Sequence, residues 1–146
     1  MNVDALVGLY FIDTNILIYT FDNSAPEKQR LARQIVSQAL KSQRGVISTQ
    51  VVQEFLNVAQ RKFSRPLNVT DCREYLKSVL STLCRQTPSI RFYDQVLLLR
   101  EELTVSFYDS MIIQAAIELG CSTLLTEDMQ SGRNIRGLKI INPFSL

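Results

Sequence analysis

The chain has 146 residues but contains no histidine and no tryptophan. Without imidazole it lacks the side chain that most often carries protons or activates nucleophiles near neutral pH. A site built from acids alone must either share protons among carboxylates or hold hard cations. The second possibility fits this sequence better, because four carboxylates follow or interrupt its apolar segments.

Cysteine is scarce, with only Cys72, Cys84 and Cys121. They form no C-x-x-C pair, and one must remain unpaired in any bridging scheme. Cys72 and Cys84 fall on one predicted helix, where twelve residues at about 1.5 Å rise separate them by roughly 18 Å, beyond disulfide reach. Reduced thiols are typical of the cytoplasm, which is the expected location.

Long apolar runs are also missing. The first twelve residues are apolar, but they have no basic head, are interrupted by Gly8 and lead directly into Asp13. We therefore expect neither a signal peptide nor a membrane span, and we expect residues 1–8 to form a frayed lead-in.

The length, with 46% hydrophobic residues, predicts one globular domain over residues 1–146. The charge is nearly balanced, with 16 Lys and Arg against 14 Asp and Glu. If four acids share one cleft, the other surface carries 16 positive groups against the remaining 10 acids, which suits a polyanion.

Short apolar runs alternate with helical periodicities along the chain. This alternation predicts an α/β domain whose mostly parallel sheet lies between helices. The expected strands are residues 9–12, 45–48, 90–92 (the weakest), 123–126 and 138–141. The expected helices are residues 26–41, 49–62, 71–84 (opened by a cap at Thr70 and Asp71), 93–102 and 109–119.

Two of the four acids are expected at one edge of this sheet. Asp13 follows the first strand, and Asp128 comes two residues after Thr126 at the end of the fourth. Ligands of open parallel sheets bind beyond the carboxyl ends of the strands. Both carboxylates would therefore lie where a ligand binds.

The other two acids lie on predicted helices. Glu54 falls just beside the apolar stripe of its helix, so it either leans into a cleft or faces solvent. Asp109 ends an S-x-x-D capping box that begins at Ser106. Asp13 and Asp128 have similar structural explanations as a cap and a turn residue, so the functional interpretation depends on all four together.

Electrostatics then points to a metal. Two unit charges about 4 Å apart repel by roughly 4 kcal/mol at an effective dielectric constant near 20, so four neighbouring acids need compensation. Hard oxygen ligands favour Mg²⁺ or Mn²⁺ over zinc or copper. Phosphate esters are the natural substrates, and metal-assisted hydrolysis is the expected reaction.

Four segments, FIDTN at 11–15, ISTQVVQEF at 47–55, SFYDS at 106–110 and LLTEDM at 124–129, resemble the motifs of the PIN-domain family in family order. The size resembles the single-domain, VapC-like toxin branch of bacterial and archaeal toxin–antitoxin pairs. The resemblance extends from Leu9 to the end of the chain. It implies a five-stranded parallel sheet of order 3-2-1-4-5 flanked by helices.

The resemblance also implies an activity and its residues. The activity is that of an Mg²⁺- or Mn²⁺-dependent endoribonuclease, with an RNA substrate, a cognate antitoxin over the cleft and a homodimeric state. Asn15 and Thr126 match positions that support the site by hydrogen bonding. The positions that match the acidic catalytic metal ligands are Asp13, Glu54, Asp109 and Asp128.

Two groups of basic residues are candidates for RNA phosphate contacts, although each is equally compatible with solvated surface. They are Arg61, Lys62 and Arg65 after the Glu54 helix, and Arg133 and Arg136 after Asp128. The aromatic residues within apolar runs are expected to pack in the core: Tyr10, Phe11, Tyr19, Phe55 and Phe107.

Two rival functions remain open. A non-catalytic RNA- or protein-binding relative would keep the fold but tolerate loss of any acid, whereas this chain retains all four. A phosphoryl-transfer enzyme with Asp13 as nucleophile would need a second acid beside it and a lysine at a strand end. Lys139 instead lies at the start of its predicted strand.

Overall fold

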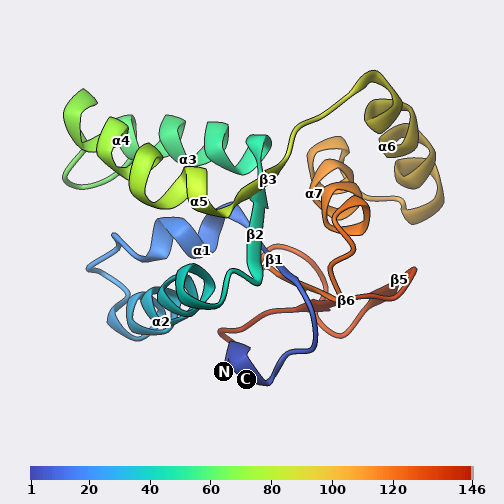
Figure 1. Ribbon diagram of the computed structural model, residues 1–146, viewed down its shortest axis with the longest axis horizontal. Helices are drawn as coiled ribbons and strands as arrows, with labels where there is room; N and C mark the ends of the chain where they lie inside the picture. Colours follow the sequence, from blue (N-terminus) through green and yellow to red (C-terminus); the bar gives the residue numbers. More distant parts are fainter. Residues whose placement is uncertain (146) are drawn as a thin grey trace.

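The computed structural model describes residues 1–145 (Figure 1). A six-stranded sheet of order β3-β2-β1-β4-β6-β5 runs through the centre, with α1 to α5 on one side and α6 and α7 on the other. The strands are β1 (Tyr10–Ile12), β2 (Gly45–Ser48), β3 (Cys84–Gln86), β4 (Thr123–Leu125), β5 (Asn134–Ile135) and β6 (Leu138–Ile141).

The helices connect these strands as crossovers. They are α1 (Thr14–Tyr19), α2 (Pro26–Ser42), α3 (Thr49–Arg61), α4 (Val69–Tyr75), α5 (Ser81–Leu83), α6 (Ile90–Leu103) and α7 (Phe107–Glu118). A 3₁₀ turn (Val3–Ala5) precedes β1, and a π-helical turn (Leu76–Leu80) joins α4 to α5.

The expected parallel sheet is confirmed for five strands in the order β3-β2-β1-β4-β6. All residues of β1, β2 and β4 are buried, as continuous apolar runs predict. The short β5 adds an antiparallel sixth strand. Arg136 and Gly137 form its two-residue hairpin, in which both have positive φ, the geometry of a type I′ turn.

The predicted strand at residues 90–92 is wrong. Ser89 caps a helix there, its Oγ accepting from the Phe92 N–H at 3.1 Å, and the α6 helix begins at Ile90. The third strand is Cys84–Gln86, where a helix was expected to end. Its sequence, Cys-Arg-Gln, has no apolar run because β3 lies at the edge of the sheet and is only partly buried.

The expected single helix over residues 71–84 is also corrected. Asn68, rather than Thr70 and Asp71, caps α4, because the Asn68 Oδ1 accepts from the Asp71 N–H at 2.8 Å. The helical path then passes through the π turn into α5 and ends at Leu83. Cys72 and Cys84 consequently lie on different elements, and all three cysteines are free thiols.

The first eight residues are packed against the domain, which does not fit the expected frayed lead-in. Val3 is fully buried in the core. The Arg44 guanidinium holds this segment by donating to the carbonyls of Leu6 at 2.6 Å and Gly8 at 3.1 Å. No helix within residues 1–145 has the length and apolar character needed to cross a membrane.

Strand register sets the position of the later site. In the β1–β4 ladder Ile12 lies opposite Leu125, so the residues that follow each strand leave the sheet side by side. Strand β2 ends at Ser48 and leads at once into α3. The carboxyl ends of these three parallel strands therefore meet at one edge.

Candidate functional site

Asp13 is the most deeply buried of the four predicted acids, with 5% of its surface exposed. It caps α1, its Oδ1 accepting from the Thr14 N–H at 2.7 Å, while its Oδ2 accepts from the Thr126 hydroxyl at 2.7 Å. Burial raises the pKa of Asp13 to about 6, although these hydrogen bonds oppose the rise; the charges of Asp128 and Glu54 add to it. The Asp13 side chain therefore caps α1 and also supplies a carboxylate to the candidate site.

Glu54 leans inward from the second turn of α3 rather than facing solvent. Its Oε2 accepts from the Thr14 hydroxyl at 3.2 Å, and its Oε1 accepts from the Gln50 amide at 2.7 Å. The same amide contacts the Tyr108 carbonyl at 3.3 Å, which joins α3 to the first turn of α7. Glu54 is therefore held next to the residue that follows Asp13.

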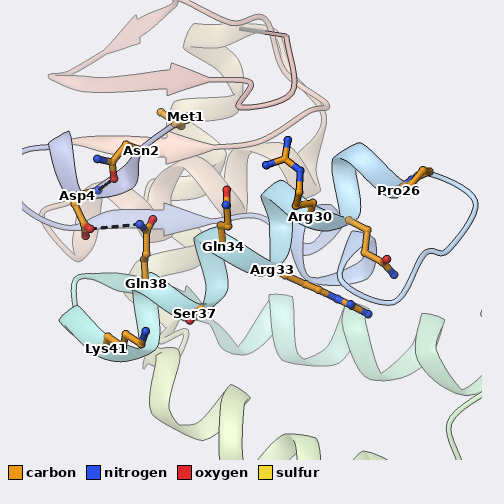
Figure 2. Close-up of a pocket in the computed structure, with 11 residues that line it drawn as sticks. Met1, Asn2, Asp4, Pro26, Arg30, Arg33, Gln34, Ser37, Gln38 and Lys41 are labelled. Atoms are coloured by element: carbon orange, nitrogen blue, oxygen red, sulfur yellow. Dashed lines mark hydrogen bonds between the residues drawn. The ribbon is translucent and has the colours of Figure 1, made fainter.

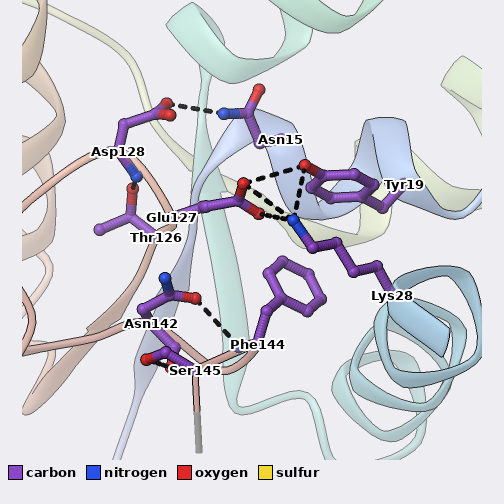
Figure 3. Close-up of polar contacts among 9 residues, drawn as sticks. All are labelled: Asn15, Tyr19, Lys28, Thr126, Glu127, Asp128, Asn142, Phe144 and Ser145. Carbon is purple, nitrogen blue, oxygen red and sulfur yellow. Dashed lines mark hydrogen bonds and ion pairs between the residues drawn. The ribbon is translucent and has the colours of Figure 1, made fainter. Parts of the chain in front are cut away.

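Asp128 lies in the loop after β4 and is exposed. Its Oδ2 accepts from the Asn15 amide at 2.7 Å, and its backbone N–H donates to the Thr126 hydroxyl at 3.2 Å (Figure 3). The pKa of Asp128 is raised, first by partial burial and then by the charges of Asp109 and Glu127, while the Asn15 amide opposes the rise.

Asp109 lies in the first turn of α7, where the Ser106 hydroxyl accepts from its backbone N–H at 3.1 Å. Only this half of the capping box forms: within residues 1–145 the Asp109 carboxylate accepts no hydrogen bond. Its charge helps to raise the pKa of Asp128, so Asp109 lies within electrostatic range of that carboxylate. The carboxylate is left available for a ligand.

Thr126 and Asn15 complete a polar network that brings three of the acids together. Asp13 reaches Asp128 through Thr126, Asn15 contacts Asp128 directly, and Thr14 links the first segment to Glu54. Asp109 is linked to this network only by its charge, which acts on Asp128. The four acids therefore gather at the carboxyl edge of the sheet, three by hydrogen bonds and the fourth by proximity.

Within residues 1–145, no cationic side chain forms an ion pair with any of the four acids. In the part of the chain that the structure describes, the two ion pairs join Lys28 to Glu127 and Arg136 to Glu102. Carboxylate oxygens that repel one another and have no ammonium or guanidinium partner suit a hard divalent cation. Among residues 1–145, however, no three such side chains already have metal-binding spacing, so a shared ion would have to draw them closer.

The predicted basic residues lie on two separate parts of the fold, at the end of α3 and around β5. Arg61 and Lys62 are exposed at the end of α3, and Arg65 follows in the next loop. Arg133 is half-buried after the Asp128 loop. Arg136 already donates to the Glu102 carboxylate, so its charge is partly neutralised.

Several contacts of the site were not predicted from the sequence. Thr14 directly follows Asp13, and Gln50 precedes Glu54 by one helical turn, so spacing could have suggested both. Glu127 is adjacent to Asp128 but points away from it, toward Tyr19 and Lys28 (Figure 3). No local spacing signals the pairing of Lys28 with Glu127, which are 99 residues apart.

A prominent surface cavity lies away from the acids. It measures about 750 Å³ and lies between α2 and the N-terminal segment, where Gln38 donates to Asp4 (Figure 2). A smaller cavity of about 370 Å³ lies between α1 and α3. Ile18 and Val58 line it, and each lies one helical turn after a partner of the Thr14–Glu54 hydrogen bond.

Comparisons with known proteins agree with this fold. The model of the PIN domain family matches residues 10–133. No curated protein matches the chain. Among solved structures, a chain of a toxin–antitoxin complex from Klebsiella pneumoniae is 23% identical, with a TM-score of 0.63 over 88% of this chain and 94% of that one.

Two further solved structures have the same fold. VapBC2 from Rickettsia felis, bound to a DNA fragment from its promoter, gives a TM-score of 0.63 at 20% identity, covering 90% of this chain and 96% of that one. VapC20 from Mycobacterium tuberculosis, a toxin that cleaves the sarcin–ricin loop, gives 0.53 at 17% identity, covering 82% and 91%.

Proposed function

The chain belongs to the PIN domain family, and from this premise we propose that it is a divalent-metal-dependent endoribonuclease, the toxin of a toxin–antitoxin pair. One observation carries the proposal. Asp13, Glu54, Asp109 and Asp128 gather at one sheet edge without any cationic partner in the described part of the chain.

The residues of this edge divide the work of holding an Mg²⁺ or Mn²⁺ ion. Asp13 and Asp128 offer carboxylates from neighbouring strand ends, with Thr126 and Asn15 fixing their orientation. Thr14 and Gln50 orient Glu54, and Asp109 contributes a carboxylate that accepts no hydrogen bond from the described residues. When bound, such an ion polarises the phosphodiester and lowers the pKa of a water molecule.

The acid cluster also explains why substrate binding would depend on the cation. A bare group of carboxylates repels an RNA phosphate, whereas a cation-filled group attracts it. Further phosphates of the RNA would be bound by Arg61, Lys62, Arg65 and Arg133, with a smaller contribution from Arg136 because Glu102 pairs with it. This binding weakens as salt increases.

The proposed protein partner is a cognate antitoxin that covers the cleft. Related structures such as that from Klebsiella pneumoniae are toxin–antitoxin complexes. The groove beyond the Thr14–Glu54 contact has apolar walls at Ile18, Phe21, Val58 and Phe63, which would receive an apolar segment of that partner. Co-purification with the product of the neighbouring reading frame, lost on Val58→Glu, would support this assignment.

We also propose a homodimer that acts in the cytoplasm. Apolar side chains at Ile90, Tyr93 and Leu97 are exposed on the outer face of α6 at helical spacing, and a second copy would cover them. Light scattering during size exclusion tests this state. A dimer mass that becomes a monomer mass in Leu97→Glu supports it, and a monomer mass for the unmodified chain contradicts it.

Cleavage of generic RNA in Mn²⁺ tests the central proposal. We expect cleavage that EDTA stops and that Asp13→Asn abolishes, while the matched surface variant Asp94→Asn cleaves normally. If the unmodified protein and both variants bind RNA without cleaving it, the non-catalytic alternative is favoured. A trapped phosphoaspartate at Asp13 would instead revive the phosphoryl-transfer alternative.

A further inference from the structure

Glu127, between Thr126 and Asp128, points away from the acid cluster. Its carboxylate receives the Lys28 ammonium at 3.1 Å (Oε1) and 3.2 Å (Oε2) and the Tyr19 hydroxyl at 3.0 Å (Figure 3). Side chains from two helices, α1 and α2, thus hold both carboxylate oxygens of Glu127.

The Lys28 ammonium lies beside two aromatic rings. It lies 4.9 Å from the centre of the Tyr19 ring and 5.6 Å from that of Phe144, and these two rings pack edge to face at 5.0 Å. Cation–π contacts add to the ion pair. The cluster therefore joins α1, α2, the loop after β4 and the segment after β6.

Helix α1 holds two adjacent acids at once. Asn15 and Tyr19 are four residues apart, so they lie one turn apart on the same face of α1. Asn15 holds Asp128 and Tyr19 holds Glu127. Because the two acids are neighbours in the chain, fixing one limits the directions that the other can take.

The Lys28–Glu127 ion pair also neutralises a negative charge next to the acid cluster. Without Lys28, Glu127 would be an uncompensated carboxylate next to Asp128, free to compete with it for the Asn15 amide. With Lys28 in place, its charge is neutralised on the side away from the cluster. The loop can then present Asp128 alone.

We propose that Lys28, Tyr19 and Glu127 form a positioning clamp that sets the direction of the Asp128 carboxylate and thereby the affinity of the site for its cation. The clamp rests on the proposed metal-dependent function. It contributes little to global stability, because the side chains of Lys28 and Glu127 are 40% and 27% exposed and such ion pairs are weak in water.

Manganese binding, followed by electron paramagnetic resonance of the free ion, tests the clamp without RNA. We expect Lys28→Met to weaken Mn²⁺ binding about 10-fold, the range typical of groups that orient metal ligands. Lys28→Arg restores most of the affinity, and the exposed control Lys77→Met has no effect. The melting temperature of Lys28→Met shifts by only a few degrees.

Kinetics and a double variant give independent readouts. At saturating Mn²⁺, kcat of Lys28→Met for RNA cleavage falls while KM changes little, because the cation then fills the site in both proteins. Lys28→Met combined with Glu127→Gln loses no more Mn²⁺ affinity than the worse single variant, because both break the same contact. Fully additive losses would overturn the clamp.

The position of Asp128 can also be followed in the metal-free protein. We expect the Asn15 side-chain amide signals in the NMR spectrum to lose their shift dispersion in Lys28→Met and in the milder Tyr19→Phe, as the hydrogen bond to Asp128 is released. Unchanged Asn15 signals and unchanged Mn²⁺ affinity in both variants would refute the clamp. If the unmodified protein binds no Mn²⁺ while the Asn15 signals do change, the proposed function fails and the loop-positioning contact stands.

Discussion

The Thr126 hydroxyl donates a hydrogen bond to the Asp13 carboxylate at 2.7 Å, across 113 residues of sequence. Both residues follow strand ends that lie opposite each other in the β1–β4 ladder. The same hydroxyl accepts from the Asp128 N–H, so one small side chain connects two acids of the site. Local sequence alone does not bring Asp13 and Asp128 together, because their contact through Thr126 also requires the β1–β4 pairing.

Replacing Thr126 by valine tests this connection. Valine keeps the shape of threonine but removes the donor to Asp13 and the acceptor for Asp128. We expect unfolding free energy to fall by about 1–3 kcal/mol, because a buried carboxylate loses a partner, and RNA cleavage to fall about 10-fold or more. Urea unfolding and initial cleavage rates measure the two effects.

Thr126→Ser is the control for that variant. Serine retains the hydroxyl and loses only a methyl group, so most of the activity should remain. Equal loss in the valine and serine variants would mean that packing of the methyl group, not the hydrogen bond, matters at this position.

Asp13→Asn should stabilise the metal-free protein even as it abolishes cleavage. The pKa of Asp13 in the folded protein is raised from 3.8 to about 6, so its charged form is disfavoured by folding. Below about pH 4 the carboxylate is protonated in both the folded and unfolded states, and the pKa difference contributes nothing. Between about pH 4 and pH 6 the unfolded chain ionises while folded Asp13 stays protonated, so the unmodified protein loses stability relative to the variant, and the difference levels off above about pH 6.

The size of this effect follows from the shift. A rise of this size in pKa corresponds to about 3 kcal/mol, reached above pH 7. Urea unfolding in EDTA from pH 4 to pH 8 measures it, and the advantage of Asp13→Asn should grow with pH. An advantage that stays constant or shrinks over this range would contradict the buried, charge-disfavouring environment.

Mn²⁺ should stabilise the protein through the same acids. A ligand that binds only the folded state adds about 2.7 kcal/mol when its concentration is one hundred times its dissociation constant. Thermal unfolding should therefore shift upward with Mn²⁺ in the unmodified protein and in Asp94→Asn. The shift should disappear in Asp13→Asn, and a shift that survives there would place the cation elsewhere.

The strands that the sequence predicted correctly are those built mainly from apolar residues. Strands β1, β2, β4 and β6 are recognisable because burial on the sheet faces selects continuous apolar runs. Strand β3, Cys-Arg-Gln at the sheet edge, carries no such run, and β5 has only two residues. Residues 90–92, Ile-Arg-Phe, resemble a short strand in sequence, but Ser89 directly precedes them as a helix cap.

The four acids could be proposed from the sequence because each comes directly after a strand or lies early in a helix. Their mutual contacts could not, because they depend on which strands are neighbours. Asn15 with Asp128, and Lys28 with Glu127, join segments 113 and 99 residues apart. Only the β1–β4 pairing brings those segments together.

Gln50→Leu tests how Glu54 is held. Gln50 is buried and donates both to the Glu54 carboxylate at 2.7 Å and to the Tyr108 carbonyl at 3.3 Å, so one amide aligns α3 with the start of α7. Leucine fills a similar volume but leaves Glu54 free to turn and the carbonyl unpaired. We expect cleavage to fall about 10-fold to 100-fold and stability by about 1 kcal/mol.

The neighbouring exposed Gln53 supplies a matched control on the same helix. Gln53→Leu makes the same chemical change without touching Glu54, so cleavage and Mn²⁺ affinity should stay within about 2-fold of the unmodified protein, as expected for a surface substitution. Since Thr14 still donates to Glu54 in Gln50→Leu, the combination of Gln50→Leu with Thr14→Val should lose more than either variant alone. A double variant as active as Gln50→Leu would mean that Thr14 does not orient this carboxylate, and that the amide alone sets its position.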